Sequence, residues 1–143
     1  MPLSKDTLQL LEVDGSLVPG PVYDQYWPYI DALPHDTLQH MYRTMAVIRA
    51  LDIEAGNLQR QGQMALWVPA IGQEACQVGS AIASRPQDSI FPAYREHAVA
   101  RLRGVSMLQI VRMLRGLAHG GWDPETHNNF HLFTLVIGSH TLH

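Results

Sequence analysis

Hydrophobic residues recur every three or four positions over residues 36–61, which places them on one face of a helix. The positions on this face are Leu38, Met41, Met45, Ile48, Leu51, Ala55 and Leu58. Asp36 and Gln39 have the spacing of a helix-capping pair, and Gly62 can adopt the left-handed conformation that ends a helix. The pattern therefore predicts one long helix over 36–61.

Two shorter helices are predicted next. The first is expected over 73–84, where small residues would let it pack closely on a neighbour and would bury the Cys76 thiol. These small residues include Ala75, Cys76, Gly79 and Ala83. The second is expected over 94–103 and ends at Gly104.

The remaining apolar segments are shorter. Ser106 and Gln109 repeat the capping pattern and predict a fourth helix that ends near residue 117. The runs at 89–91 and 132–137 suit an extended segment and a buried strand. A strand followed by a helix would begin an α/β sheet, so the chain is expected to be mostly helical with the first strands of an α/β fold.

Residues 1–35 contain five prolines, which argues against a long regular element there. Asp14 and Gly15 predict a tight turn at 13–16. Aromatic residues crowd the stretch from Tyr23 to Tyr29, with little else to bury them. We expect an extended arm over 1–35 that packs either on a partner or on the chain's own core, followed by one domain over 36–143.

Composition limits the classes of protein that fit. The chain has 143 residues, of which 46% are hydrophobic and 16% charged. This length and hydrophobic content are enough to bury one core. The net charge of −3 provides no general attraction to nucleic acid or to an anionic membrane. Cys76 is the single cysteine, so no internal disulfide can form. Without a targeting segment or a membrane-spanning run in the sequence, the cytoplasm is the expected location.

Arg95 is the first candidate for ligand binding. A guanidinium presents paired donors that match two phosphate oxygens, and the neighbouring Tyr94 adds a hydroxyl. If a helix begins at these residues, its unpaired backbone amides add positive potential at the same place. The alternative from the local sequence is an ion pair between Arg95 and Glu96 or another surface carboxylate.

Other clusters favour competing functions. Half of the ten basic residues fall between 95 and 115, which would suit a nucleic-acid surface: Arg95, Arg101, Arg103, Arg112 and Arg115. That stretch contains no aromatic residue and no helix-turn-helix pattern, so nucleic acid is not an expected partner. His127 and His131 have a spacing seen at zinc sites, but turn-forming residues surround them and no metal site is predicted.

Four motifs together resemble a known family. They are LQRQGQMALWVPAIGQEA at 58–75, FPAYREHAV at 91–99, LRG at 102–104 and IGSHTLH at 137–143. They resemble the amino-terminal part of the alpha subunit of a thiamine-diphosphate-dependent 2-oxo acid dehydrogenase, over residues 36–143. The resemblance implies an α/β thiamine-diphosphate-binding fold. It also implies that the chain is a fragment, because it ends before the family's metal-binding loop.

The resemblance implies roles for particular residues. Tyr94 and Arg95 correspond to the pair that binds the cofactor diphosphate, and the Gly138 backbone to a group that contacts the aminopyrimidine. His140 stands where the family props the bent cofactor, usually with an apolar or amide side chain. A potassium ion bound by some relatives is not expected, since Leu142 replaces one of their polar ligands.

Leu66, Trp67 and Val68 correspond to the substrate pocket, where an apolar wall favours a branched aliphatic substrate; the alternative is that they belong to the core. The implied function is the oxidative decarboxylation of a branched-chain 2-oxo acid, or of pyruvate, with acyl transfer to lipoyl groups. The implied cofactors are thiamine diphosphate and Mg²⁺. The implied partners are a beta subunit in an α2β2 assembly and a lipoyl-bearing E2 core. The alternative is an inactive interaction module that binds a partner subunit.

Overall fold

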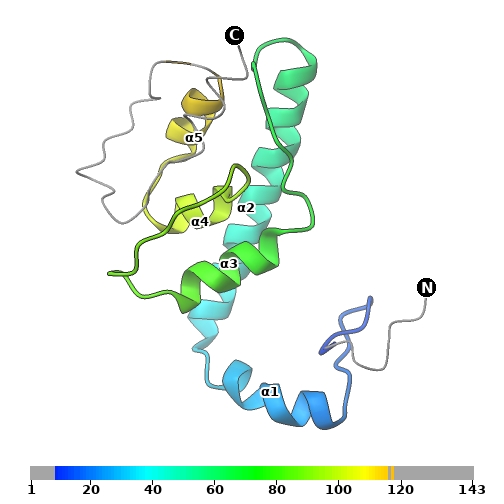
Figure 1. The fold of residues 1–143 in the computed structure, drawn as a ribbon. Coiled ribbons are helices and arrows are strands. Elements are labelled where there is room, and N and C mark those ends of the chain that lie inside the picture. Colours follow the sequence, from blue (N-terminus) through cyan, green and yellow to red (C-terminus); the bar gives the residue numbers. More distant parts are fainter. Residues whose placement is uncertain (1–8, 116, 118–143) are drawn as a thin grey trace. The chain divides into compact units, whose positions relative to one another are not determined.

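The computed structural model describes residues 9–115 and residue 117, and this part of the chain is helical. Five helices follow one another along it: α1 (Pro21–Asp31), α2 (His35–Arg60), α3 (Glu74–Ala83), α4 (His97–Leu102) and α5 (Met107–Leu114) (Figure 1). The predicted helical character is confirmed. Extended structure within the described residues amounts to an isolated bridge between Leu11 and Leu17 and a bridge residue at Ile90. The strand expected at 132–137 lies outside the described residues.

The chain divides into two compact units, Met1–Gln39 and His40–His143, with the boundary inside α2. In the first unit the predicted turn at 13–16 is confirmed. The Glu12 amide donates to the Ser16 carbonyl at 2.8 Å and the Gly15 amide to the Glu12 carbonyl at 3.0 Å. Gly15 has a φ of +86°, which a side chain would disfavour, so glycine suits this turn.

The extended arm expected over 1–35 is wrong at residues 21–31, which form α1. Pro21 occupies the start of the helix, where no backbone N–H is needed, and Pro28 is tolerated inside it. Tyr23 and Trp27 lie one turn apart and stack with ring centroids 4.9 Å apart. Proline count alone was therefore a poor guide, because the position of each proline decides its effect.

Helix α2 confirms the predicted long helix and its end at Gly62, where φ is +70°. It begins at His35, so Asp36 lies inside the first turn and does not precede it as a cap. Ile48 and Ala55 on the predicted face are buried. Two polar residues that the hydrophobic pattern does not include, Thr44 and Asp52, are buried on α2 as well.

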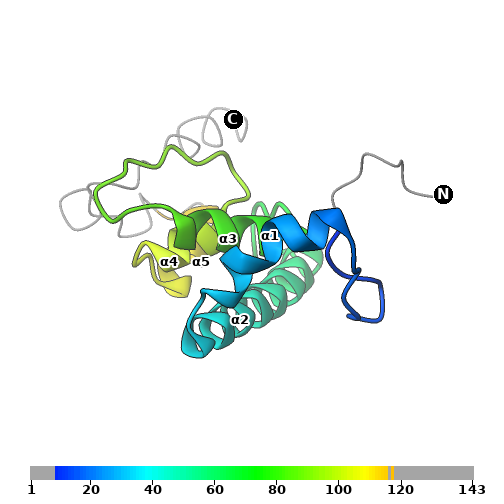
Figure 2. The same cartoon turned by 90° about the horizontal axis from the view of Figure 1, so that it is seen from below.

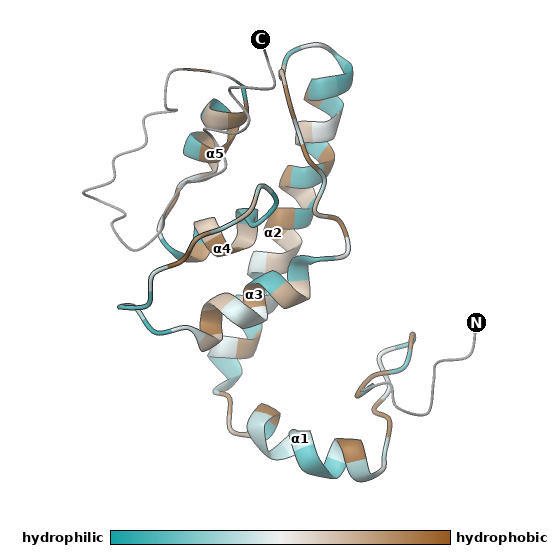
Figure 3. Ribbon diagram, viewed as in Figure 1, coloured by the Kyte–Doolittle hydropathy of each residue, from teal (hydrophilic) through white to brown (hydrophobic). Residues whose placement is uncertain are grey.

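The core of the second unit lies between α2, α3, α4 and α5, and both views show α3 and α4 beside α2 (Figures 1 and 2). Helices α2, α3 and α5 each carry hydrophobic and hydrophilic residues, as amphipathic helices do (Figure 3). One cluster joins Ile48, Val78 and Ala98 from three helices. The other is larger and contains Ala55, Met64, Trp67, Ala81, Val99, Ala100, Val105 and Ile110.

The expectation for the face of α3 is wrong. Its buried residues are Glu74, Gln77, Val78 and Ala81, whereas Cys76 is exposed. Among the described residues, a Cβ at Gly79 would meet no atom within 4 Å, so this glycine makes no close contact with another helix there. Small residues fit either side of a helix, and the larger Val78 side chain, which is fully buried, determines which side faces the core.

The predicted start of α4 and the predicted end of α5 are both wrong by about three residues. Helix α4 starts at His97, so Tyr94 and Arg95 precede it, and it ends before Gly104, where φ is +90°. Helix α5 has the predicted capping box between Ser106 and Gln109. It ends at Leu114 and not near 117, because the Leu117 amide turns back to the Arg112 carbonyl at 3.2 Å.

Candidate functional site

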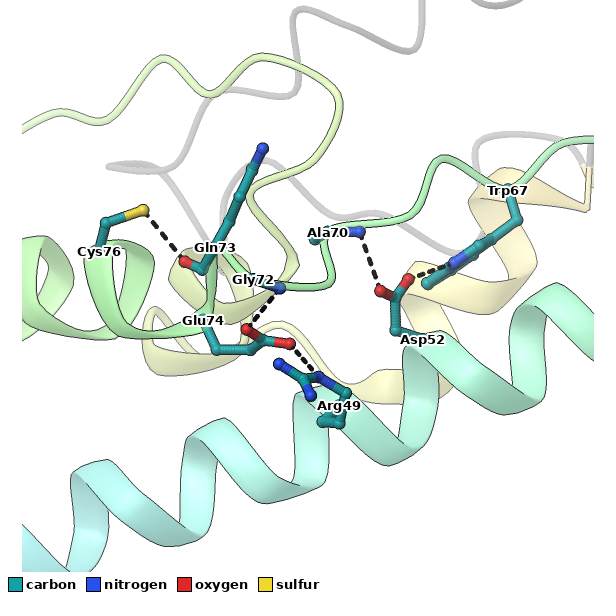
Figure 4. Close-up of polar contacts among 8 residues, drawn as sticks. All are labelled: Arg49, Asp52, Trp67, Ala70, Gly72, Gln73, Glu74 and Cys76. Carbon is teal, nitrogen blue, oxygen red and sulfur yellow. Dashed lines mark hydrogen bonds and ion pairs between the residues drawn. The ribbon is translucent and has the colours of Figure 1, made fainter. Parts of the chain in front are cut away.

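The segment between α2 and α3 is attached to α2 through Asp52. This carboxylate is buried, and its two oxygens accept hydrogen bonds from the Trp67 indole N–H at 2.6 Å and from the Ala70 amide at 2.9 Å (Figure 4). Charge-assisted bonds of this kind offset the cost of burying a carboxylate. Asp52 therefore holds both sides of Pro69, which lies between its two partners in the chain.

A second carboxylate fastens the end of the same segment. Glu74, in the first turn of α3, accepts from the Arg49 guanidinium and from the Gly72 amide, the latter at 2.9 Å (Figure 4). The hydrogen bond from Arg49 lowers the pKa of the Glu74 carboxyl to about 2, although its burial alone would raise that pKa. The carboxylate is thus charged over the whole physiological pH range.

Arg95 lies against this segment. Its Nε donates to the Pro69 carbonyl at 3.1 Å, and its guanidinium lies 4.5 Å from the centre of the Tyr94 ring. The two terminal nitrogens of Arg95 and the Tyr94 hydroxyl make no hydrogen bond within the described part of the chain. Two guanidinium donors and one hydroxyl are therefore available to a ligand.

Two expectations for Arg95 need correction. The carboxylate of Glu96 accepts from the Arg95 backbone amide at 3.2 Å, and no ion pair joins it to the guanidinium among residues 9–115 and 117. The start of α4 does not supply free amides beside Arg95 either. The His97 amide donates to the Arg95 carbonyl at 2.7 Å, and the Ala98 amide donates to Gln77 at 3.1 Å.

Gln77 on α3 holds the backbone that carries Arg95. Its amide nitrogen donates to the Arg95 carbonyl at 3.0 Å, and its amide oxygen accepts from the Ala98 amide at 3.1 Å. Gln77 as a whole is only 5% exposed, so water offers little replacement for these bonds. One residue of α3 therefore connects the end of the Tyr94–Arg95 segment to the first turn of α4.

His97 is a buried titratable residue at the same place. Its ring stacks on Trp67, with centroids 4.6 Å apart, and is hydrogen-bonded to the Val68 backbone. Its Nε2 is buried and has no hydrogen-bond partner in the described part of the chain. Burial lowers the pKa of His97, against the opposing effect of the Val68 hydrogen bond, and favours a neutral imidazole.

The structure brings most of the expected site residues together. Leu66, Trp67 and Val68 lie just before Pro69, and Trp67 is buried in the core while Leu66 and Val68 are partly exposed. Gly138 and His140 lie outside the described residues. Sequence reasoning missed Asp52, Gln77 and His97. For Asp52 a signal existed, since it lies four residues after Ile48 and three before Ala55 on the core face of α2.

Three features of residues 9–115 and 117 bear on other kinds of site. No group of three or more potential metal-ligating side chains lies together there. No helix in that part of the chain is long and apolar enough to cross a membrane. Arg103, one of the clustered arginines, donates to Ser84 and to the carbonyls of Arg85 and Pro86, so it holds the turn after α3.

Comparison with known proteins identifies the family. The model for "Dehydrogenase E1 component" matches residues 42–134, a range that includes the contacts of Asp52, Glu74, Gln77 and Arg95. The chain belongs to the dehydrogenase E1 component family. The resemblance to the alpha subunit of a 2-oxo acid dehydrogenase is thereby confirmed.

Relatives within the E1 component family carry two kinds of name. The chain is 39% identical over its whole length to 37% of a 3-methyl-2-oxobutanoate dehydrogenase subunit alpha from Mycobacterium tuberculosis (strain CDC 1551 / Oshkosh). It is 41% identical over 65% of its length to 27% of a pyruvate dehydrogenase E1 component subunit alpha from Acholeplasma laidlawii. A mitochondrial 2-oxoisovalerate dehydrogenase subunit alpha 2 from Arabidopsis thaliana is 37% identical over 53% of the chain and 16% of its own length. The matched regions thus cover between 16% and 37% of the length of these three E1 subunits.

Proposed function

We propose that this chain contributes the diphosphate-binding part of an E1 alpha subunit that catalyses thiamine-dependent oxidative decarboxylation of a 2-oxo acid. The single observation that carries the proposal is the arrangement of Arg95. Its Nε is held by the Pro69 carbonyl while its terminal nitrogens and the Tyr94 hydroxyl have no partner among residues 9–115 and 117. Membership in a thiamine-diphosphate-dependent family supports the assignment of this donor set to a diphosphate.

The donor set fits such a ligand chemically. A guanidinium with two open N–H groups matches two oxygens of one phosphate, and a phenol O–H adds a third donor. When bound, thiamine diphosphate supplies a nucleophilic carbon and an electron sink for loss of carbon dioxide. The residues described here bind and orient the diphosphate end. A metal ion such as Mg²⁺ would need ligands from outside the described residues, since no ligand cluster lies within them.

For the substrate, we propose a branched-chain 2-oxo acid, with pyruvate as the alternative. Leu66 and Val68 are apolar and partly exposed on either side of the buried Trp67, which suits an aliphatic substrate chain. The name of the Mycobacterium tuberculosis relative supports this choice, and the name of the Acholeplasma laidlawii relative supports the alternative. A comparison of kcat/KM for 3-methyl-2-oxobutanoate and pyruvate, with the same preparation, decides between them.

We also propose that residues 36–143 belong to the cofactor-binding domain of the whole subunit, which acts with a beta subunit and a lipoyl-bearing E2 core. Large apolar side chains exposed on α2 support a covering partner: Tyr42 is 69% exposed and Ile53 48%. They are separated by 11 positions, close to three helical turns, so they share a side of the helix.

The test of the cofactor role uses the native polypeptide purified with its beta subunit. Arg95→Lys keeps the charge but replaces the planar fork with a single ammonium, which has no separate Nε for the Pro69 carbonyl and no paired terminal donors for two phosphate oxygens. We expect the thiamine diphosphate concentration for half-maximal activity to rise roughly 10- to 100-fold, the value of one or two charged hydrogen bonds. Arg101→Lys, at an exposed position of α4, is the matched control and should leave it unchanged. Equal cofactor requirements for both variants would refute the proposal.

A further inference from the structure

Gln77 and Asp52 act on Arg95 from two different helices. Gln77, on α3, uses both ends of its amide to hold the backbone from the Arg95 carbonyl to the Ala98 amide, at 3.0 and 3.1 Å. Because the side chain is buried, a shift of this backbone would leave polar groups without partners. The position of the Arg95 main chain is therefore set by α3.

Asp52, on α2, acts through the acceptor of the Arg95 side chain. Its carboxylate binds Trp67 and the Ala70 amide, the residues on either side of Val68 and Pro69 (Figure 4). The Pro69 carbonyl between these attachments accepts from Arg95 Nε at 3.1 Å. Asp52 thereby determines where that carbonyl points.

Together these contacts restrict Arg95 at three places: its backbone carbonyl, its Nε and the face of its guanidinium against the Tyr94 ring. An arginine side chain otherwise loses considerable rotamer freedom when it binds a ligand. We infer that Asp52 and Gln77 are positioning residues for Arg95, which pre-orient its two open donors toward a diphosphate. This inference rests on the proposed cofactor role of Arg95.

The test measures the Kd of thiamine diphosphate and kcat at saturating cofactor, with the native polypeptide and its beta subunit. In Gln77→Glu a carboxylate replaces the donor to the Arg95 carbonyl, and in Asp52→Asn one of two buried donors loses its acceptor. We expect each change to raise the Kd of thiamine diphosphate roughly tenfold, the size of effect usual for coupling between contacting residues. The kcat at saturating cofactor should change much less. A residue that only supports the fold would not separate Kd from kcat in this way. Gln87→Glu, in the exposed turn after α3, is the matched control.

A double-mutant cycle with Arg95→Lys completes the test. If Asp52 and Gln77 act through Arg95, their substitutions should weaken Kd little further once Arg95 is lysine. Effects that add in full, or single variants with unchanged Kd, would overturn the inference while the proposed role of Arg95 stands. An unchanged Kd for Arg95→Lys alone would instead overturn the proposed function. Thermal unfolding identifies any variant that fails to fold, for which Gln77→Asn and Asp52→Glu provide the same measurement.

Discussion

The Trp67 indole stacks on the His97 imidazole, with ring centroids 4.6 Å apart and ring planes inclined by 24°. The pair joins the segment after α2 to the first residue of α4, and both side chains are buried. Trp67 also donates to Asp52, so the His97 imidazole, the Asp52 carboxylate and the Trp67 indole meet at one point of the core. Stability at this point should respond both to pH and to small changes in hydrogen bonding.

Acidification should destabilise the protein through His97. Burial lowers its pKa from the usual value of 6.5, so the unfolded chain takes up a proton that the folded chain resists. The stability contributed by the neutral ring is complete above 6.5 and declines as pH falls below it. Urea unfolding between about pH 7.5 and 5.5 should show this loss, and His97→Phe should reduce it. An equal loss in His97→Phe and in the exposed control His40→Phe would contradict the assignment.

A second acid-sensitive contribution comes from Glu74. Its pKa of about 2, lowered mainly by the hydrogen bond from Arg49, lies below the usual value of 4.5. The unfolded state therefore binds the proton first, and the stabilisation is present above 4.5 and is lost as pH falls toward 2. Glu74→Gln should reduce the loss of unfolding free energy between about pH 4.5 and 2, whereas Glu54→Gln at an exposed position of α2 should leave that loss unchanged.

Asp52→Asn should lower the free energy of unfolding by about 1–3 kcal/mol, the cost of leaving a buried donor without an acceptor. An amide oxygen can accept from Trp67 or from Ala70, but its NH2 group faces the other donor. Trp67→Phe removes one of the same bonds, so the two substitutions together should cost less than their sum. Chemical denaturation of the two single variants and the double variant measures this. Full additivity would show that the bond is not shared as described.

The capping box of α5 should be measurable by itself. The Gln109 backbone amide donates to Ser106 Oγ at 3.2 Å, and the Ser106 backbone amide donates to Gln109 Oε1 at 2.8 Å. Ser106→Ala should lower stability by about 1 kcal/mol and should speed amide hydrogen exchange in α5. Ser89→Ala, an exposed serine outside any helix, controls for loss of a hydroxyl. Unchanged exchange in α5 would argue against the cap.

Features that depend on neighbouring residues were predictable. The period of the apolar positions located α2, Gly62 and Gly104 marked helix ends, and the Ser106–Gln109 pair marked the start of α5. Each follows from local geometry, since a helix surface repeats every 3.6 residues and a positive φ favours glycine. The motif around Tyr94 and Arg95 likewise indicated the family that the comparison confirms.

Features that depend on distant residues could not be predicted from the sequence. The start of α4 at His97 is set by Gln77, which binds the Arg95 carbonyl from 18 residues away. The face of α3 was predicted wrongly because packing against other helices selects it. Proline count was also insufficient for α1, where Pro21 suits the first turn.

The sequence by itself indicated the helices α2 to α5, the family the chain belongs to and the arginine that is the candidate ligand for a phosphate, but not α1. Only the tertiary structure decided what surrounds that arginine. Its Nε partner is 26 residues away at Pro69, and Asp52 reaches the same segment across 15 and 18 residues. Helical periodicity and capping act within a few residues, whereas the direction of a buried hydrogen bond depends on how separate helices pack.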